Sequence, residues 1–370
     1  MSTVAGLNDA TVKLEAQGLR DLVTAIFAAT GCSTKEAARI GIYLVGANLA
    51  GHDSHGVVRV PRYVQMHQDG LILADQVVEP IIDTPVMAIL DGKYGFGQTV
   101  APQAVDIGIA KCRAHGLSAI GLRRAGHIGR VGDWAEMAAQ ANLVSMHFVK
   151  AAGSVLVAPF GGVERRFSTA PCCMGVPRPG EDPLILDFAT SVVAEGKVLV
   201  ASQGGKKLPA DALVGPDGAA SSDPRLLYGE EGQHDHRKGR GAIRAFGDHK
   251  GSGLALMCEL IGGALTGNGA TDPAQPRFAN GMFSIYVDPA VIDPQSYFPH
   301  EVARYVGYVK SSRPSEQSNE VLVPGEPEAQ RRAERQAHGI PLPQATWSSI
   351  LATARAVGLD PRRFEALVQK

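Results

Sequence analysis

The stretch Gly126-His127-Ile128-Gly129-Arg130-Val131-Gly132 follows a predicted strand, Leu117 to Leu122, and precedes a predicted helix that starts near Asp133. In a Rossmann domain, a strand and a helix are joined by a Gly-x-Gly-x-x-Gly turn that binds a dinucleotide. The three glycines here are separated by two residues each, and Gly95-Phe96-Gly97 lacks the third glycine of that pattern. The sequence therefore disfavours a Rossmann domain.

Outward from this stretch, the apolar pattern alternates between strands and helices. Strands are predicted at 86–90, 117–122, 143–149 and 184–188, and helices at 98–114 and from Asp133, where Glu136 completes a capping pattern. Both ends of the chain are helical in pattern: 19–31 and 33–51 at the start, and 301–310, 328–336 and 346–357 near the end. A span from Gly204 to Lys250 is predicted to be irregular, and an apolar helix follows it. The fold class is α/β.

Composition excludes several classes of protein. The net charge is −1, so no basic face points to nucleic acid, and no apolar run approaches the roughly 20 residues that span a bilayer. The first nine residues lack the blocks of a secretion signal. The five cysteines are odd in number, and Cys172 and Cys173 are adjacent. We expect reduced thiols in a cytoplasmic protein.

Two glycine-flanked clusters carry the candidate chemistry. Gly51-His52-Asp53-Ser54-His55-Gly56-Val57-Val58-Arg59 and the Gly126–Gly132 stretch each combine histidine with a nearby arginine. Histidine exchanges protons near neutral pH, and arginine binds carboxylates as a fixed fork. A structural histidine at a turn is the alternative for each, but the repeated combination favours an enzyme acting on a small acid, with His55 and His127 as acid/base residues.

A metal site is the rival hypothesis. His52, Asp53 and His55, or His234, Asp235 and His236, could ligate a metal in a hydrolase or lyase, although neither spacing matches a zinc pattern. The second group lies in a charged run typical of a solvated loop. A non-catalytic dinucleotide-binding protein would leave both histidine clusters unexplained.

Two further segments suit a nucleotide. Asp187 ends an apolar strand, where Thr190 and Ser191 would more often cap the following helix than contact a ribose. His249 and Lys250 open a helix whose free amides suit a phosphate. Taken alone, Pro324-Gly325-Glu326 indicates only a turn.

Taken together, these segments resemble the malate/L-lactate dehydrogenase family of NAD(P)-dependent 2-hydroxyacid oxidoreductases. The matching pieces run in family order over nearly the whole chain: AGHDSHGVVRVPRY, GHIGRVGDWAE, VAPFGG, DFATSVVAEGK, DHKGSGLALMCELIGGAL, PGE and RQAHGIPLP. HIGR and QAHGIPLP are most similar to the hydroxycarboxylate dehydrogenase B branch. Other branches act on ureidoglycolate, diketogulonate, sulfolactate or cyclic imino acids.

The resemblance implies a non-Rossmann fold with a mixed sheet and helical N- and C-terminal segments. Residues 1–84 and 300–370 would form a helical substrate and dimerisation lobe, and residues 85–299 an NAD(P)-binding α/β lobe. It further implies a cytoplasmic homodimer that uses NAD or NADP, with NAD favoured, no resident metal, and a 2-oxoacid substrate whose developing negative charge a protonated histidine neutralises.

The resemblance also implies residue roles. His55 and His127 match the acid/base positions, and Ser54 and Arg59 match substrate contacts. The positions implied for the cofactor are His55, Gly129, Arg130, Asp187, Phe188, Ala189, Thr190, Ser191, His249, Lys250, Pro324, Gly325 and Glu326. One segment departs from the family: Phe167-Ser168-Thr169-Ala170-Pro171 stands where many members carry Gly-Thr-Asn-Pro.

Overall fold

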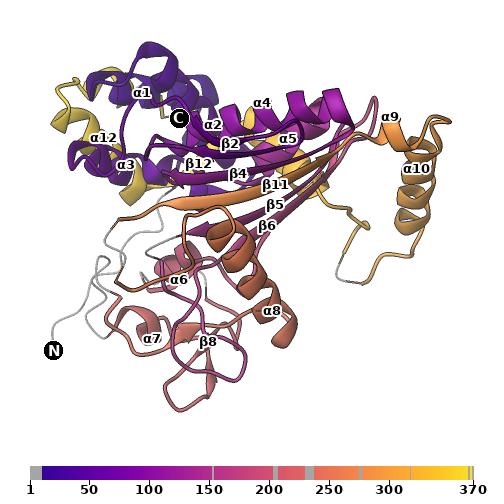
Figure 1. Cartoon of the computed structure of the whole chain (residues 1–370). Coiled ribbons are helices and arrows are strands. Elements are labelled where there is room, and N and C mark those ends of the chain that lie inside the picture. The colour runs from indigo at the N-terminus through magenta and orange to yellow at the C-terminus, as the bar shows by residue number, and fades with distance from the viewer. Residues whose placement is uncertain are drawn as a thin grey trace, which may run out of the picture.

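The molecule is built on a central seven-stranded sheet (Figure 1). The computed structural model describes residues 11–151, 154–202, 207–229, 237–274, 277–316, 318–365 and 367–368. In spatial order the strands are β2 (Glu79–Asp83), β3 (Met87–Asp91), β4 (Leu117–Ala125), β11 (Asn280–Val287), β5 (Val144–Ala151), β6 (Pro171–Val176) and β7 (Leu184–Ala189). β3 and β4 run parallel, and the other neighbouring strands run antiparallel. The prediction of a mixed sheet in an α/β fold is confirmed.

Helices cover both faces of this sheet, because successive strand residues point to opposite sides. Val149 of β5 packs in the core beneath α4 (Gly97–His115) and α5 (Gly132–Gln140). Its neighbour Phe148 packs on the other face against Ala255 and Cys258 of α8 (His249–Cys258), which continues as the π-helix η3 (Glu259–Ala264). Burial on both faces is consistent with the apolar strand pattern in the sequence.

The capping prediction for α5 is wrong. The helix begins at Gly132, and no side chain caps it from Val131, the residue before it. Asp133 and Glu136 instead turn to the guanidinium of Arg130. A buried cation one turn back thus competes successfully for both carboxylates.

A helical layer at one end of the sheet joins the two ends of the chain (Figure 1). It contains α1 (Ala16–Ala29), α2 (Thr34–Leu49), α3 (Val60–Gln68) and α12 (Gln344–Ala356), and β1 (Thr11–Leu14) pairs with β12 (Ile340–Pro343). Phe27 of α1 and Trp347 of α12 belong to one apolar core. The N-terminal helices are therefore completed by residues more than 300 positions later.

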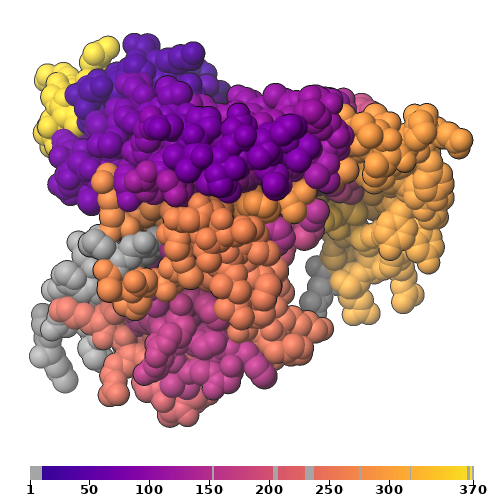
Figure 2. Space-filling view, viewed as in Figure 1, coloured from indigo at the N-terminus to yellow at the C-terminus, as the bar shows by residue number. Residues whose placement is uncertain are grey.

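A small lobe lies on the opposite side of the sheet from α4 and α5 (Figures 1 and 2). It contains α6 (Glu195–Ser202), α7 (Arg225–Tyr228) and a sheet in the order β10 (Ala242–Ile243), β8 (Leu213–Val214) and β9 (Ala220–Ser221). Leu213, Leu227 and Ile243 form part of its own core. The described part of the span 204–250 is thus more ordered than predicted, because two-residue strands give no periodic pattern.

The C-terminal helices predicted from the sequence are present. α9 (Pro289–Ile292) and α10 (Tyr297–Lys310) project from the far end of the sheet (Figures 1 and 2). α11 (Glu326–His338) then leads to β12 and α12, and α13 (Arg362–Glu365) lies near the end of the chain. Within the described ranges, no helix combines the length and apolarity that crossing a membrane requires.

Candidate active site

The first histidine cluster forms two tight turns between α2 and α3. They are the 3-10 helices η1 (Asp53–His55) and η2 (Val57–Arg59). The buried Asn48 side chain accepts a hydrogen bond from the Val57 amide at 2.8 Å and donates one to Asp53 Oδ1 at 2.6 Å. A Cβ at Gly56 would lie 2.2 Å from Asn48 Oδ1, so glycine is required there. These contacts fix the turn that carries His55.

The second cluster is a turn at the end of β4. Asn280 Oδ1 accepts from the Ile128 amide at 3.0 Å, and Gln98 Nε2 donates to the His127 carbonyl at 3.3 Å. A Cβ at Gly97 would lie 2.2 Å from that carbonyl. The turn carrying His127 is therefore tied to both β11 and α4.

The fold brings the two predicted acid/base residues together. The imidazole rings of His55 and His127 are stacked, with centroids 5.5 Å apart and planes inclined by 13°. Ser54 Oγ lies 3.1 Å from His55 Nδ1, and the hydroxyl of Tyr63 is hydrogen-bonded to His127 Nδ1. Each ring is thus held at Nδ1 by a hydroxyl group.

Both imidazoles are held in the neutral form. Burial, together with the nearby charge of Arg59, lowers the pKa of His55 to about 3. Burial, followed by Arg59, also holds the pKa of His127 well below its ordinary value. The imidazoles of the resting site are therefore neutral, whereas the protonated histidine expected from the sequence belongs to the reduction step. The resting site offers neutral rings that can donate a hydrogen bond through N–H or accept a proton.

Arg59 lies beside this pair, at the start of α3. Its Nε donates to the Ser54 carbonyl at 2.6 Å, and no partner for its two outer nitrogens is present among the described residues. Arg62, three residues further along the chain, is exposed. A Cβ at Gly196, at the start of α6, would lie 3.1 Å from Ser54 Cβ, so the small lobe faces this turn. The outer edge of the Arg59 guanidinium is available for a carboxylate.

Tyr63, which the sequence analysis did not single out, contacts His127 Nδ1 through its hydroxyl. It follows Arg59 by four positions, and residues at that spacing share one face of a helix. This spacing is the only feature of the sequence that could have linked Tyr63 to Arg59. It is a weak signal, because a tyrosine in an apolar stripe usually belongs to the core.

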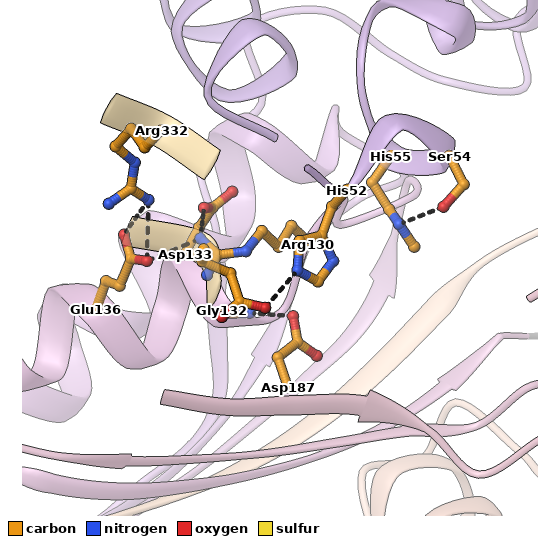
Figure 3. A network of polar contacts seen from close by, with 10 residues as sticks. His52, Ser54, His55, Arg130, Gly132, Asp133, Glu136, Asp187 and Arg332 are labelled. Atoms are coloured by element: carbon orange, nitrogen blue, oxygen red, sulfur yellow. Dashed lines mark hydrogen bonds and ion pairs between the residues drawn. The ribbon is translucent and has the colours of Figure 1, made fainter. Parts of the chain in front are cut away.

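Arg130 lies at the centre of a buried polar network (Figure 3). Its side chain is enclosed, with Nη1 2.9 Å from Asp133 Oδ1 and 2.8 Å from Glu136 Oε1, and Arg332 of α11 pairs with the same Glu136. In the part of the chain that the structure describes, Nε and Nη2 have no hydrogen-bond partner. Because the guanidinium is enclosed, a cofactor in this region would meet the backbone of Gly129 and Arg130.

Asp187 joins the end of β7 to the start of α5 (Figure 3). Its Oδ2 accepts a hydrogen bond from the Gly132 amide at 2.7 Å, and burial raises the pKa of this carboxyl group, against the opposing effects of His52 and Arg130. Asp187 therefore caps a helix far from it in sequence.

The hydroxyls of Thr190 and Ser191 make internal contacts. Thr190 Oγ1 donates to the carbonyls of Thr169 and Ala170, and Ser191 Oγ donates to the Val193 carbonyl. The expectation that these two residues cap the following helix is therefore wrong.

The start of α8 lies beside a hollow of about 230 Å³. The hollow is lined by 158–163 of the PFGG segment, together with Arg244 and Asp248 among others. His249 and Lys250 are exposed at the helix start, and the His249 ring lies 5.8 Å from that of Phe160. Nearby, the rings of Phe188 and Phe246 are 5.6 Å apart. Phe160 thus lines the hollow, and His249 and Lys250 follow directly after its lining residue Asp248. The amides of Lys250 and Gly251 are not free, because they donate to the carbonyls of Gly247 and Phe246.

The Pro324-Gly325-Glu326 turn docks on β7. The Ile185 amide donates to the Pro324 carbonyl at 3.3 Å. Gly325 has a φ of 96°, and a Cβ there would lie 2.8 Å from the Pro183 carbonyl oxygen. Glu326 is paired with Lys310, and it also accepts from the Val323 amide. The turn places α11 against the two histidine turns.

The residues of the rival metal site have other partners. His52 Nε2 lies 3.2 Å from Glu328 Oε1, and Asp53 is paired with Arg335. Within the described ranges, no three His, Cys, Asp or Glu side chains are placed to hold a metal ion. His234, Asp235 and His236 lie outside the described residues.

The segment that departs from the family pattern has a distinctive backbone. Ala170 has a φ of 32°, in the left-handed region that asparagine and glycine adopt more readily. Ser168 donates to the buried Glu259 at 2.9 Å. The missing asparagine of the family therefore coincides with a left-handed residue.

Comparison with known proteins shows which family the chain resembles over most of its length. The family model for malate/L-lactate dehydrogenase matches residues 14–351. The chain is 35% identical to hydroxycarboxylate dehydrogenase B of Escherichia coli (strain K12), over 97% of this chain and 98% of the relative. It is 31% identical to an L-lactate dehydrogenase of Cupriavidus necator, over 94% and 99%.

A solved structure agrees. Sulfolactate dehydrogenase from Methanocaldococcus jannaschii superposes with a TM-score of 0.82 at 26% identity, covering 95% of this chain and 99% of that one. The comparisons give no support to the hydrolase or lyase alternative. The sequence prediction of a 2-hydroxyacid oxidoreductase is confirmed, and the chain belongs to the malate/L-lactate dehydrogenase family.

Proposed function

We propose that this chain is a nicotinamide-dependent oxidoreductase that interconverts a small 2-oxoacid and the corresponding 2-hydroxyacid. The observation that carries the proposal is the stacked pair of neutral imidazoles, His55 and His127, beside the outer nitrogens of Arg59, which have no partner among the described residues. A 2-oxoacid has a carboxylate next to its reacting carbonyl, and one guanidinium can bind the first while an imidazole N–H contacts the second.

The chain's own residues bind, orient and exchange a proton. A bound nicotinamide would supply or accept the hydride. Arg59 holds the carboxylate, with Ser54 supporting both its Nε and the His55 ring. In reduction, an imidazole N–H donates to the carbonyl oxygen as negative charge develops there. In oxidation, a neutral imidazole accepts the hydroxyl proton.

We propose that the cofactor lies between the end of β7 and the start of α8. The contributing groups are the backbone of Gly129 and Arg130, Asp187 through Ser191, His249 with Lys250, the Pro324-Gly325-Glu326 turn, and His55 at the reacting end. The hollow beside His249 supports this path. NAD is favoured over NADP, since Arg244 at this hollow is already paired with Asp211 and Asp248 and is less available for a 2′-phosphate.

We also propose the lobe assignment and assembly that the family resemblance implies. Residues 85–299 would bind the cofactor, and 1–84 with 300–370 would serve substrate binding and dimerisation. Self-association through the second of these segments is supported by the exposed Tyr305 and Tyr308 on α10. The five free cysteines suit a reducing cytoplasm. Size-exclusion chromatography with light scattering tests the dimer.

The decisive experiment follows nicotinamide absorbance while the purified chain reduces a panel of 2-oxoacids. NADH and NADPH are compared at matched concentrations, with and without a chelator. We expect turnover that is insensitive to the chelator and a lower KM for NADH. Failure to oxidise either cofactor with any 2-oxoacid contradicts the proposal. Loss of activity with the chelator would instead favour the metal alternative.

A further inference from the structure

Tyr63 stands directly behind the His127 imidazole. Its side chain is 2% exposed, and its hydroxyl is hydrogen-bonded to His127 Nδ1. The two rings are 5.9 Å apart and inclined by 60°, and Phe96 packs against the Tyr63 ring at 6.4 Å. The buried hydroxyl is thus held on the nitrogen of His127 by packing within α3 and α4.

The proton in this contact can be located. Burial raises the pKa of Tyr63 to about 12, so the phenol keeps its proton at neutral pH. The alternative acceptor is the His127 carbonyl, which is 3.5 Å from the phenol oxygen and already accepts from Gln98 Nε2. The Tyr63 hydroxyl therefore donates to Nδ1. Because the ring is neutral, its own proton is on Nε2.

We propose that Tyr63 is the proton source behind His127 in carbonyl reduction, an inference that rests on the function proposed above. As the hydride reaches C2, the Nε2–H bond of His127 breaks and an O–H bond forms on the substrate oxygen. The Oη–H bond of Tyr63 breaks, and an Nδ1–H bond forms. The products are a hydroxyacid, a neutral His127 with its proton on Nδ1, and a Tyr63 phenolate that then takes a proton from water.

Burial disfavours a phenolate at Tyr63, and the surrounding cations offset part of that effect. The fields of Arg59 and Arg62 both act to stabilise the phenolate. His55 has a serine hydroxyl at the corresponding nitrogen, and an alcohol is a far weaker acid than a phenol. The relay therefore assigns proton transfer to His127 and leaves His55 to orient the substrate.

The test replaces Tyr63 with Phe, which removes one oxygen and keeps the packing. Tyr43→Phe is the matched control, because the Tyr43 hydroxyl contacts only Met137 Sδ, at 3.6 Å, in the described structure. We expect Tyr63→Phe to lower kcat for 2-oxoacid reduction by about 10²-fold, in the range of general acid catalysis. The Kd for NADH and the thermal midpoint should match those of Tyr43→Phe.

Two further measurements separate a relay from a structural role. In Tyr63→Phe, His127 must bind a proton before it can donate one, so kcat should rise as pH falls, whereas wild-type kcat should vary less. Since Tyr63 acts through His127, the double variant with His127→Ala should lose no more than His127→Ala alone.

The outcomes distinguish this inference from the proposed function. If Tyr63→Phe keeps kcat within the change seen for Tyr43→Phe, or if its loss adds fully to that of His127→Ala, the relay is overturned while the proposed function stands. If His127→Ala itself retains wild-type kcat, the acid/base assignment in the proposed function fails first.

Discussion

At the scale of single residues, the two histidines carry the acid/base hypothesis. Replacing His55 or His127 with alanine should lower kcat by about 10²–10⁴-fold, since each ring either transfers the proton or orders the reacting group. NADH affinity, measured by fluorescence titration, should stay close to wild type. His147→Ala is not a suitable control because that ring is fully buried between Ser145 and Ser284. His115→Ala, at the exposed end of α4, is suitable. A histidine whose loss costs less than tenfold is not the acid/base residue.

Arg59 is tested through the charge of the substrate. Losing a desolvated charged partner costs about 2–5 kcal/mol, so Arg59→Met should raise KM for a 2-oxoacid strongly and leave NADH affinity intact. The preference for the free acid over its amide or ester should narrow. Arg62→Met is the control, because Arg62 is exposed one turn away. An unchanged preference in Arg59→Met would show that the carboxylate is held elsewhere.

Whether a site residue can be predicted from the sequence depends on the kind of contact that it makes. Ser54, His55, Arg59 and His127 were selected because histidine and arginine beside glycine are unusual pairings with a defined chemistry. Tyr63 was missed because its hydroxyl acts through a neighbour 64 residues away, and no local pattern reports that distance. The protonation state of the resting imidazoles depends on burial, which residue type alone does not report.

At the scale of elements, α11 acts as a clasp on the first histidine turn. Arg335 binds Asp53 through two contacts, of 2.6 and 3.0 Å, and also reaches the Asn48 carbonyl. Asn48 and Asp53 are the residues that fix the His55 turn. Arg335→Met should therefore lower kcat, by up to about 10²-fold if the ring shifts by an ångström.

Arg331→Met provides the control for this clasp. Arg331 lies one turn earlier on α11 and is paired with Glu334 of the same helix. Its replacement should leave kcat near wild type, as measured in the same 2-oxoacid assay. Equal losses in the two variants would mean that α11 acts through its overall stability and not through the Asp53 contact.

Elements with a strong periodic pattern were predicted well, and those held by distant contacts were not. Four of the seven sheet strands (β3, β4, β5 and β7) and the long helices follow from apolar spacing, whereas β2, β6 and β11 were not predicted. The predicted cap of α5 is wrong because Asp133 and Glu136 bind Arg130 instead. The Gly132 amide at the helix start donates to Asp187, which lies on β7. The strands of the small lobe were not predicted because each is only two residues long.

At the scale of the whole molecule, buried imidazoles make stability depend on pH. Burial lowers the pKa of His147 to about 3, while the unfolded side chain titrates near 6.5. Between these values unfolding takes up a proton, so the free energy of unfolding contributed by His147 rises with pH and is lost as the solution is acidified. The slope approaches about 1.4 kcal/mol per pH unit for one proton.

His147→Gln isolates this effect. Asp133, whose pKa burial raises to about 6, gives a dependence of opposite sign, so the wild-type curve alone is ambiguous. Urea unfolding of both proteins between pH 4 and pH 6, about the middle of that window, should show a shallower slope in the variant. Parallel curves would mean that His147 is protonated in the folded protein.

The clasp between Arg335 and Asp53 also has a consequence for synthesis. The two residues are 282 positions apart in the sequence. β1 likewise cannot form its pairing until β12 has been synthesised. At roughly 5–20 residues per second, a ribosome needs about 15–60 s to make the intervening chain. During that time Leu22, Phe27 and Leu44 of α1 and α2 have no Trp347 or Ile350 to cover them. We therefore expect the nascent N-terminal helices to need chaperones until the last tenth of the chain, which contains β12 and Trp347, has emerged.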